Sequence, residues 1–179
     1  ILVDPKGVDY NRYRGATLLT PNRQELAEAA GQHVDNDDAV VLAARLLINT
    51  CGIGGILATR GEEGATLVNA NGIAQLAARH PQKVFDVSGA GDTVIAALAA
   101  GLASGATLEL AAELANIAGG VVVGKVGTAV ALPSEILEVV NKHDFPSTVS
   151  KVMTLKIAVD RVATWRRQGY RVGLTNGCF

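Results

Sequence analysis

The stretch VFDVSGAGDTVIAALAAGLASG, residues 84–105, places a run of small residues directly before an apolar helical pattern. Asp86 precedes the run SGAG, and Asp92 follows it. A helix that only fills a core needs one capping residue at its start, not two carboxylates around a segment that almost lacks side chains. The stretch therefore predicts a helix whose first turn binds a ligand.

The chemistry of that turn favours phosphate. A backbone turn made of Gly89, Ala90 and Gly91 can point several N–H groups at one spot, where the helix dipole adds partial positive charge. Such a concavity suits a phosphoryl group during transfer, and Asp92 beside it could accept the proton of an attacking hydroxyl. A plain helix cap after a glycine-rich turn is the alternative. The pattern is neither a P-loop nor a dinucleotide fingerprint, because no Lys-Ser/Thr follows and Val94 occupies the third glycine position.

Composition narrows the class of protein. The 179 residues are 49% hydrophobic and 18% charged, which is typical of a globular chain. A net charge of −1 without a Lys/Arg run argues against a nucleic-acid partner, and no apolar run approaches the roughly 20 residues that span a bilayer. Cys51 and Cys178 lie far apart without a CxxC, which favours a reducing compartment, the cytoplasm.

Alternating strand and helix patterns predict an α/β layered domain with a mixed sheet. A change of apolar period in the middle of the chain, with an Asn-Gly turn, indicates a three-stranded meander. The expected elements are strands at residues 1–4 and 16–20, helices at 21–31 and 36–52, the meander at 54–78, and helices after Asp92 and at 108–123.

The sequence pattern changes near Pro133, where a short amphipathic helical pattern is followed by a polar, proline-containing stretch. We expect the α/β domain to occupy residues 1–143. A linker, centred on 144–150, and an amphipathic helix would fill 144–169, and 170–179 would form the first strand of another domain. Both ends read as strands that are cut, which predicts a piece of a longer protein.

The sequence DVSGAGDTVIAALAAG, residues 86–101, closely resembles the second signature of the ribokinase-like (PfkB) carbohydrate kinases. The resemblance implies a ribokinase-like layered α/β fold, of which this chain carries the C-terminal half, and ATP as the phosphoryl donor. It also implies that Asp92 is the catalytic base. The amides of Gly89, Ala90 and Gly91 would form an anion hole.

A second motif of that family is matched by TPNRQE, residues 20–25, which resembles the family's N-x-x-E motif. In such a motif the Asn and Glu share one helix face and can organise Mg²⁺ waters and ATP phosphates, since Mg²⁺ keeps several waters. Asn-x-x-Glu is equally a capping box; beside the Asp92 motif we favour the magnesium role for Asn22 and Glu25. The nucleotide-binding residues implied here are Asn22, Arg23, Gln24 and Glu25.

Two weaker matches would border the nucleotide. TRGEEGA, residues 59–65, resembles the family's T-x-G-x-x-G turn through Thr59, Gly61 and Gly64, although by itself it is only a hairpin turn. Asn116 matches a helix position near the adenine in relatives; it could equally be a packing residue of an alanine-rich helix.

A narrower resemblance concerns the substrate. ILVDPKG (1–7), YRGATLLTPNRQE (13–25) and, beyond the linker helix, TNGCF (175–179) closely resemble the bifunctional enzymes of bacterial ADP-heptose synthesis. In those enzymes the last strand opens a Rossmann-like nucleotidyltransferase domain. The resemblance implies Mg-ATP-dependent phosphorylation of D-glycero-β-D-manno-heptose 7-phosphate at O1, and AMP transfer to heptose 1-phosphate in the second domain. Lys6 either faces the nucleotide phosphates or is simply solvated.

Two alternatives stay open. One is another ribokinase-like sugar or nucleoside kinase, against which the linker helix and TNGCF argue. The other is an inert nucleotide-binding module, against which Asp92, Asn22 and Glu25 argue. For the favoured function the expected partners are a sugar phosphate and ATP, with no nucleic acid and no membrane. The complete protein is expected to be a homodimer.

Overall fold

The computed structural model describes residues 1–78, 89–125, 129–143, 154–167 and 169–173. The chain divides into two compact units, Ile1–Val140 and Asn141–Phe179, and each is described by itself. Within the described residues no helix combines the length and the apolar character that crossing a membrane requires.

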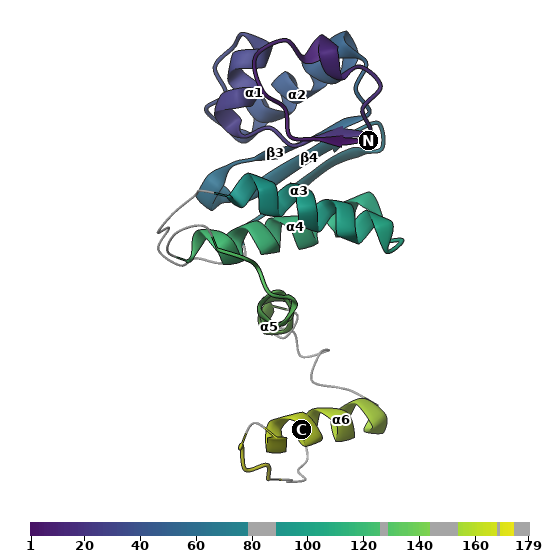
Figure 1. Ribbon diagram of the computed structural model, residues 1–179, viewed down its shortest axis with the longest axis vertical. Coiled ribbons are helices and arrows are strands. Elements are labelled where there is room, and N and C mark those ends of the chain that lie inside the picture. The colour runs from purple at the N-terminus through teal and green to yellow at the C-terminus, as the bar shows by residue number, and fades with distance from the viewer. Residues whose placement is uncertain (79–88, 126–128, 144–153, 168, 174–179) are drawn as a thin grey trace. The chain divides into compact units, whose positions relative to one another are not determined.

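A mixed sheet forms the centre of the first unit (Figure 1). Strands β1, β2 and β3 run parallel, and β3, β4 and β5 form an antiparallel meander. The mixed sheet predicted from the sequence is thereby confirmed. Because β1, β2 and β3 are parallel, their carboxyl ends meet at one edge of the sheet. The strands are β1 (Leu2–Val3), β2 (Leu18–Leu19), β3 (Gly55–Thr59), β4 (Ala65–Asn69) and β5 (Gly72–Leu76), in that spatial order.

Helices cover both faces of this sheet, α1 and α2 on one and α3 and α4 on the other (Figure 1). They lie where the sequence predicts them, while two short 3₁₀ turns, η1 and η2, were not predicted. The elements are η1 (Tyr10–Tyr13), α1 (Arg23–Ala30), α2 (Asp37–Cys51), η2 (Gly61–Glu63), α3 (Ala90–Ala103), α4 (Leu108–Val123) and α5 (Pro133–His143), the last of which packs on α4.

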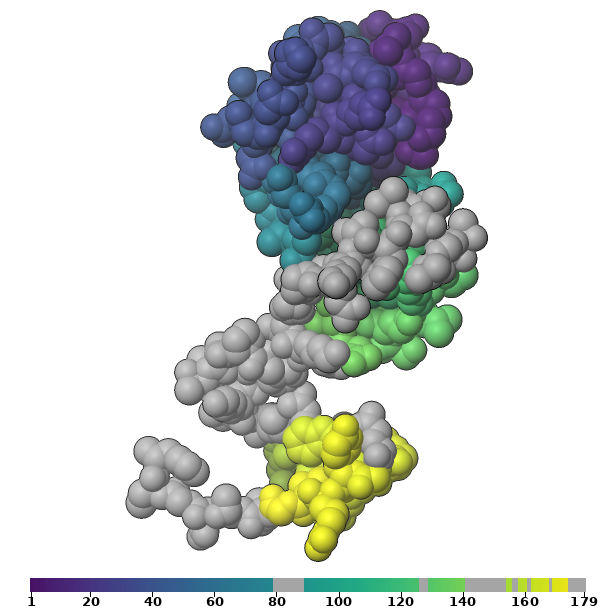
Figure 2. Space-filling view, turned by 90° about the vertical axis from the view of Figure 1, so that its left-hand side faces the viewer, coloured from purple at the N-terminus to yellow at the C-terminus, as the bar shows by residue number. Residues whose placement is uncertain are grey.

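Two apolar clusters hold these layers together. Successive residues of a strand point to opposite faces, so Leu19 and Ile56 join the cluster beneath α1 and α2, while Leu18 and Leu57 join the cluster beneath α3 and α4. All four side chains are completely buried. Such burial on both faces is typical of a parallel sheet between two helical layers. In the space-filling view the N-terminal residues and α1 and α2, in purple and blue, pack closely against one another (Figure 2).

Local sequence signals explain where α1 and α2 begin and end. Asn22 and Asn36 cap them, each accepting a backbone N–H three residues further along. Gly31 and Gly52 end them in the left-handed conformation, with φ of 64° and 68°. Cap and stop residues of this kind are the reason that the sequence pattern located both helices correctly.

Helix α6 (Leu155–Arg167) lies within the second unit, in the segment where the sequence predicts an amphipathic helix. Gly169 follows it with φ of 84°, and its N–H donates to the carbonyl of Arg166 at 3.1 Å. Residues 170–173 adopt no regular secondary structure, so a strand is not formed over this part of the predicted 170–179. The remainder of that strand and the linker at 144–150 lie outside the described residues.

Candidate active site

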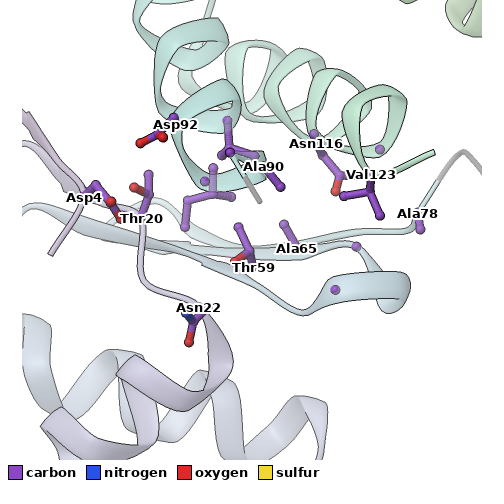
Figure 3. A pocket seen from close by; sticks show the side chains of 18 of the residues that line it. Asp4, Thr20, Asn22, Thr59, Ala65, Ala78, Ala90, Asp92, Asn116 and Val123 are labelled. Atoms are coloured by element: carbon purple, nitrogen blue, oxygen red, sulfur yellow. The ribbon is translucent and has the colours of Figure 1, made fainter. Parts of the chain in front are cut away.

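The carboxyl ends of β1, β2 and β3 open onto a cavity of about 1100 Å³ in the first unit. Asp4 follows β1, Thr20 follows β2 and Thr59 ends β3, and all three line the cavity (Figure 3). Asp92 of α3 and Asn116 of α4 line it from the other helical layer. Open α/β sheets bind their ligands at this edge, so the fold alone points to the cavity as the functional site.

The first turn of α3 presents backbone amides to this cavity. Its N-cap is Gly89, with φ of 78°, and the helical hydrogen bonds begin with the N–H of Thr93, which donates to the Gly89 carbonyl at 3.0 Å. The amides of Ala90, Gly91 and Asp92, the first three residues of α3, therefore have no hydrogen-bond acceptor within the helix. A Cβ built on Gly91 would meet no atom within 4 Å. Helix amides without an acceptor inside the helix thus line the cavity, an arrangement that suits anion binding.

Asp92 occupies the third position of α3, inside the helix and not at its cap. The side chain is exposed and lines the cavity. Because Gly89 fills the N-cap position, the alternative in which Asp92 serves as a plain helix cap is disfavoured. A carboxylate in the first turn still interacts favourably with the helix dipole. Asp86 and Ser88 of the same motif lie outside the described residues.

Asn22 and Glu25 both line the cavity and also form the capping box of α1. Asn22 Oδ1 accepts the Glu25 N–H at 2.8 Å, and Glu25 Oε2 accepts the Asn22 N–H at 2.9 Å. The capping box, which is the alternative to a magnesium role, is thus complete. It does not exclude a ligand role, because Glu25 Oε1 takes no part in it and accepts a hydrogen bond from Lys6 instead.

Lys6 lies between two carboxylates of the cavity wall. Its Nζ is 2.8 Å from Glu25 Oε1 and 3.1 Å from Asp4 Oδ2. The hydrogen bond with Glu25, followed by the one with Asp4, raises the pKa of Lys6 above its ordinary value. Lys6 is therefore an ion-paired residue of the cavity, although its side chain is 69% exposed.

Arg23 and Gln24, two of the predicted nucleotide contacts, are not among the residues that line the cavity. Arg23 pairs with Glu63, and Gln24 Nε2 donates to Glu28 Oε1 at 2.8 Å. Successive helical residues are turned by about 100°, so the two residues between Asn22 and Glu25 face away from the side that this pair shares.

The predicted turn after β3 does reach the cavity, through Thr59, Gly61 and Gly64. Gly64 has φ of 97°, and a Cβ there would lie 2.0 Å from the carbonyl oxygen of Leu76, so only glycine fits. Arg60 anchors the turn from below: its side chain is only 6% exposed and pairs with Asp37 and Glu63. These ion pairs connect the turn to the first residue of α2.

Asn116 also lies on the cavity wall, where its Nδ2 donates to the Ala77 carbonyl at 2.9 Å. That bond ties α4 to the chain that follows β5. The side chain thus has the packing role that the sequence left open, at the place where a ligand role was predicted.

Sequence reasoning missed Asp4 and Thr20 as site residues. Each directly follows a short apolar strand, and polar residues at the carboxyl ends of parallel strands are the signal that could have found them. The sequence also did not predict that small residues at the C-terminal end of α4 complete the wall; these are Gly119 and Gly120 of α4 and Gly124, which follows it.

Comparison with known proteins gives the family. The sequence model of the pfkB family carbohydrate kinases matches residues 1–135. "Bifunctional protein HldE" of Paramagnetospirillum magneticum is 54% identical over 179 residues, which cover 100% of this chain and 37% of that protein. The protein of the same name from Rhodospirillum rubrum is 50% identical, with 100% and 36% covered. The chain therefore spans little more than a third of the length of these curated relatives.

Solved structures give the fold. Phosphofructokinase-2 from Escherichia coli, in complex with potassium, superposes with a TM-score of 0.71 at 24% identity, over 79% of this chain and 46% of that one. Arabidopsis thaliana ribokinase, complexed with ribose and ATP, superposes with a TM-score of 0.69 at 22% identity, over 77% and 46%. The predicted ribokinase-like α/β fold is confirmed. With the family match over residues 1–135, the chain belongs to the pfkB family of carbohydrate kinases.

Proposed function

We propose that this chain forms the C-terminal half of a sugar kinase that transfers the γ-phosphoryl group of ATP to O1 of D-glycero-β-D-manno-heptose 7-phosphate. The family membership supports a carbohydrate substrate. The relatives named bifunctional HldE match the chain over its whole length and support the heptose substrate. The observation that carries the proposal is the first turn of α3, where the amides of Ala90 and Gly91 and the carboxylate of Asp92 line one cavity.

The proposed reaction uses these groups in one step. Asp92 accepts the proton of the O1 hydroxyl while O1 forms a bond to the γ-phosphorus, and the bond from that phosphorus to the bridging oxygen of ADP breaks. The amides at the start of α3 donate to the phosphoryl oxygens as negative charge redistributes over them. The products are the 1,7-bisphosphate, ADP and a proton on Asp92, which passes to solvent.

The residues of the cavity fit Mg²⁺ held through water. Asn22 and Glu25 supply oxygen atoms, which Mg²⁺ prefers, and Mg²⁺ retains several water ligands. Among the residues that the structure describes, no three acidic, histidine or cysteine side chains converge as a closed metal site, which favours binding through water. When bound, Mg²⁺ would neutralise charge on the ATP phosphates.

The rest of the cavity would hold the nucleotide. We assign its phosphate side to the turn of Thr59, Gly61 and Gly64, which lines the wall beyond Asn22. Asn116 lines that wall together with Val123 (Figure 3), and an apolar side chain beside an amide suits an adenine ring. Arg23 and Gln24 have no place in this assignment, because they do not line the cavity.

We also propose that residues 144–169 connect the kinase domain of residues 1–143 to a nucleotidyltransferase domain that begins at 170–179. The word "bifunctional" in the names of the relatives, and their greater length, support this arrangement. That domain would transfer AMP to heptose 1-phosphate. The homodimer and the cytoplasmic location of the complete protein stay predictions.

The test is substrate-dependent ADP formation by the complete protein, with Mg-ATP and one of three sugars: heptose 7-phosphate, ribose or fructose 6-phosphate. We expect heptose 7-phosphate to give the highest kcat/KM and a product with a second phosphorus resonance coupled to the anomeric proton. Preference for either other sugar would favour another kinase of the family. ADP formation with none of them would favour an inert nucleotide-binding module.

A further inference from the structure

Lys6 is held in place by more than its charge. Its backbone N–H donates to the Tyr13 hydroxyl at 2.9 Å, and that hydroxyl donates to the Lys6 carbonyl at 3.0 Å. Pro5, which is buried, restricts the backbone just before it. The backbone of Lys6 is thus fixed at the cavity, while its side chain, a flexible four-carbon stem, is 69% exposed.

The ammonium group of Lys6 stands where two carboxylates of the cavity converge. Asp4 Oδ2 and Glu25 Oε1 both lie within ion-pair distance of the same nitrogen, at 3.1 and 2.8 Å. The two carboxylates are only 27% and 22% exposed. Two half-buried negative charges at the mouth of a cavity repel one another, so they need a cation between them. In this structure Lys6 supplies it.

The same two carboxylates would attract a divalent cation more strongly than an ammonium group, because the attraction scales with charge. Both cations cannot occupy the same oxygens without repulsion. Once displaced, the Lys6 ammonium is the positive group at the rim of a cavity that the proposed function fills with phosphates. A lysine is a compact point charge on a flexible stem and suits such a change of partner.

We propose that Lys6 is an exchangeable counter-ion of the cavity: it neutralises Asp4 and Glu25 while no divalent cation is bound, and binds the nucleotide phosphates when a divalent cation takes the two carboxylates. This deepens the proposed function and rests on it for the identity of the phosphate ligand. It makes Lys6 a residue that opposes metal binding alone and supports binding of the metal–nucleotide complex.

The experiment measures both affinities in the complete protein. Free Mn²⁺ is titrated without nucleotide and followed by its electron paramagnetic resonance signal. Calorimetry then measures binding of the Mg²⁺ complex of an ATP analogue with an imido group between the β- and γ-phosphorus atoms. Four proteins are compared: wild type, Lys6→Met, Lys6→Arg and Arg45→Met. Arg45, exposed on α2, provides a control for the loss of one positive charge.

We expect Lys6→Met to bind Mn²⁺ about three- to tenfold more tightly than wild type, the range for two partly exposed ion pairs that no longer compete. The same variant should bind the Mg²⁺–analogue complex about tenfold more weakly, since a charge-assisted phosphate contact is lost. Lys6→Arg should stay close to wild type in the Mn²⁺ titration, and Arg45→Met should match wild type in both measurements.

Equal Mn²⁺ affinity in Lys6→Met and wild type would overturn the proposal, as would undiminished binding of the analogue. The proposed function fails separately: if wild type does not phosphorylate heptose 7-phosphate but both affinities shift as expected, the counter-ion role stands and the substrate assignment does not. Because exposed ion pairs contribute little to folding, Lys6→Met should keep the melting temperature of wild type, and a thermal melt verifies this.

Discussion

Asp92 is the residue on which the proposed chemistry depends, and its position inside α3 makes a clean test possible. It is exposed, lines the cavity and is not the cap of its helix. Asp92→Asn keeps the size of the side chain but removes the base. We expect kcat in the complete protein to fall by about 10²–10⁴-fold, with an unchanged melting temperature by calorimetry. Turnover near that of wild type would show that the carboxylate is not the base.

Gly91 tests the anion hole separately from the base. A Cβ there would meet no atom within 4 Å, and alanine is a better helix former than glycine by about 0.5–1 kcal/mol. Gly91→Ala should therefore be at least as stable as wild type. Because Gly91 lines the cavity, a methyl group there would occupy space that the phosphoryl group needs, and we expect kcat/KM for ATP to fall by at least about tenfold.

Gly64→Ala is the matched control for Gly91→Ala. With φ of 97° and a neighbouring carbonyl oxygen at 2.0 Å from the new Cβ, it should lower the free energy of unfolding by more than about 1 kcal/mol. Urea unfolding of both variants, beside the kinetic assay, separates loss of the fold from loss of the site. Full activity in Gly91→Ala would contradict an anion hole at the first turn of α3.

At the scale of elements, α3 and α4 approach closely because of their small residues. A Cβ on Gly119 of α4 would lie 2.8 Å from Val94 Cγ2 of α3, and one on Gly101 would lie 3.1 Å from Ala111 Cβ. Gly119→Ala should lower the free energy of unfolding by about 1–3 kcal/mol through overpacking. Val94→Ala removes the opposing methyl groups, so the double variant should lose less than the two single variants together. Strict additivity in urea unfolding would show that the two positions do not meet.

The start of α5 gives a dependence of stability on pH. Glu135 Oε2 accepts Lys125 Nζ at 2.6 Å and the Leu132 N–H at 2.8 Å, and these bonds lower the pKa of Glu135 below its ordinary value of 4.5. A lowered carboxyl pKa stabilises the fold above the unfolded-state pKa, and this contribution is lost as the pH falls through the folded-state pKa. Wild type should thus exceed Glu135→Gln in stability at pH 7, and the difference should vanish as the pH drops well below 4.5. A difference that stays constant down to pH 3 would contradict the assignment.

At the scale of the whole molecule, the described residues that line the candidate site lie in the first unit, and they come from the sheet and from both helical layers. Nucleotide binding should therefore stabilise that unit as a body, by about 2.7 kcal/mol at a ligand concentration of 100 Kd. Hydrogen exchange of the complete protein, with and without the imido ATP analogue, measures this. Protection should rise in β3, α3 and α4, and exchange in α6 should stay unchanged. Protection confined to the first turn of α3 would contradict a site shared by the layers.

Much of the fold could be predicted because its signals are local. Asn22 and Asn36 indicate where two helices begin, and Gly31 and Gly52 indicate where they end. The strands that follow show the apolar period of a meander. The run Gly89–Asp92 could be interpreted as a ligand-binding helix start because its signal is also local. These features depend on residues a few positions apart, where propensity and hydrogen bonding within one turn decide the conformation.

The assembly of the site depended on tertiary structure. Asp4, Thr20 and Asp92 come from separate parts of the chain and meet only because parallel strands align their carboxyl ends beneath α3. Lys6 reaches Glu25 across that edge, and Arg23, although adjacent to Asn22 in the sequence, is turned by the helix away from the cavity and toward Glu63. The spacing of residues along the sequence shows which residue types are available for a site. Strand order and the packing of helices on a twisted sheet decide which of them face one another, because those distances are set by contacts between segments far apart in the chain.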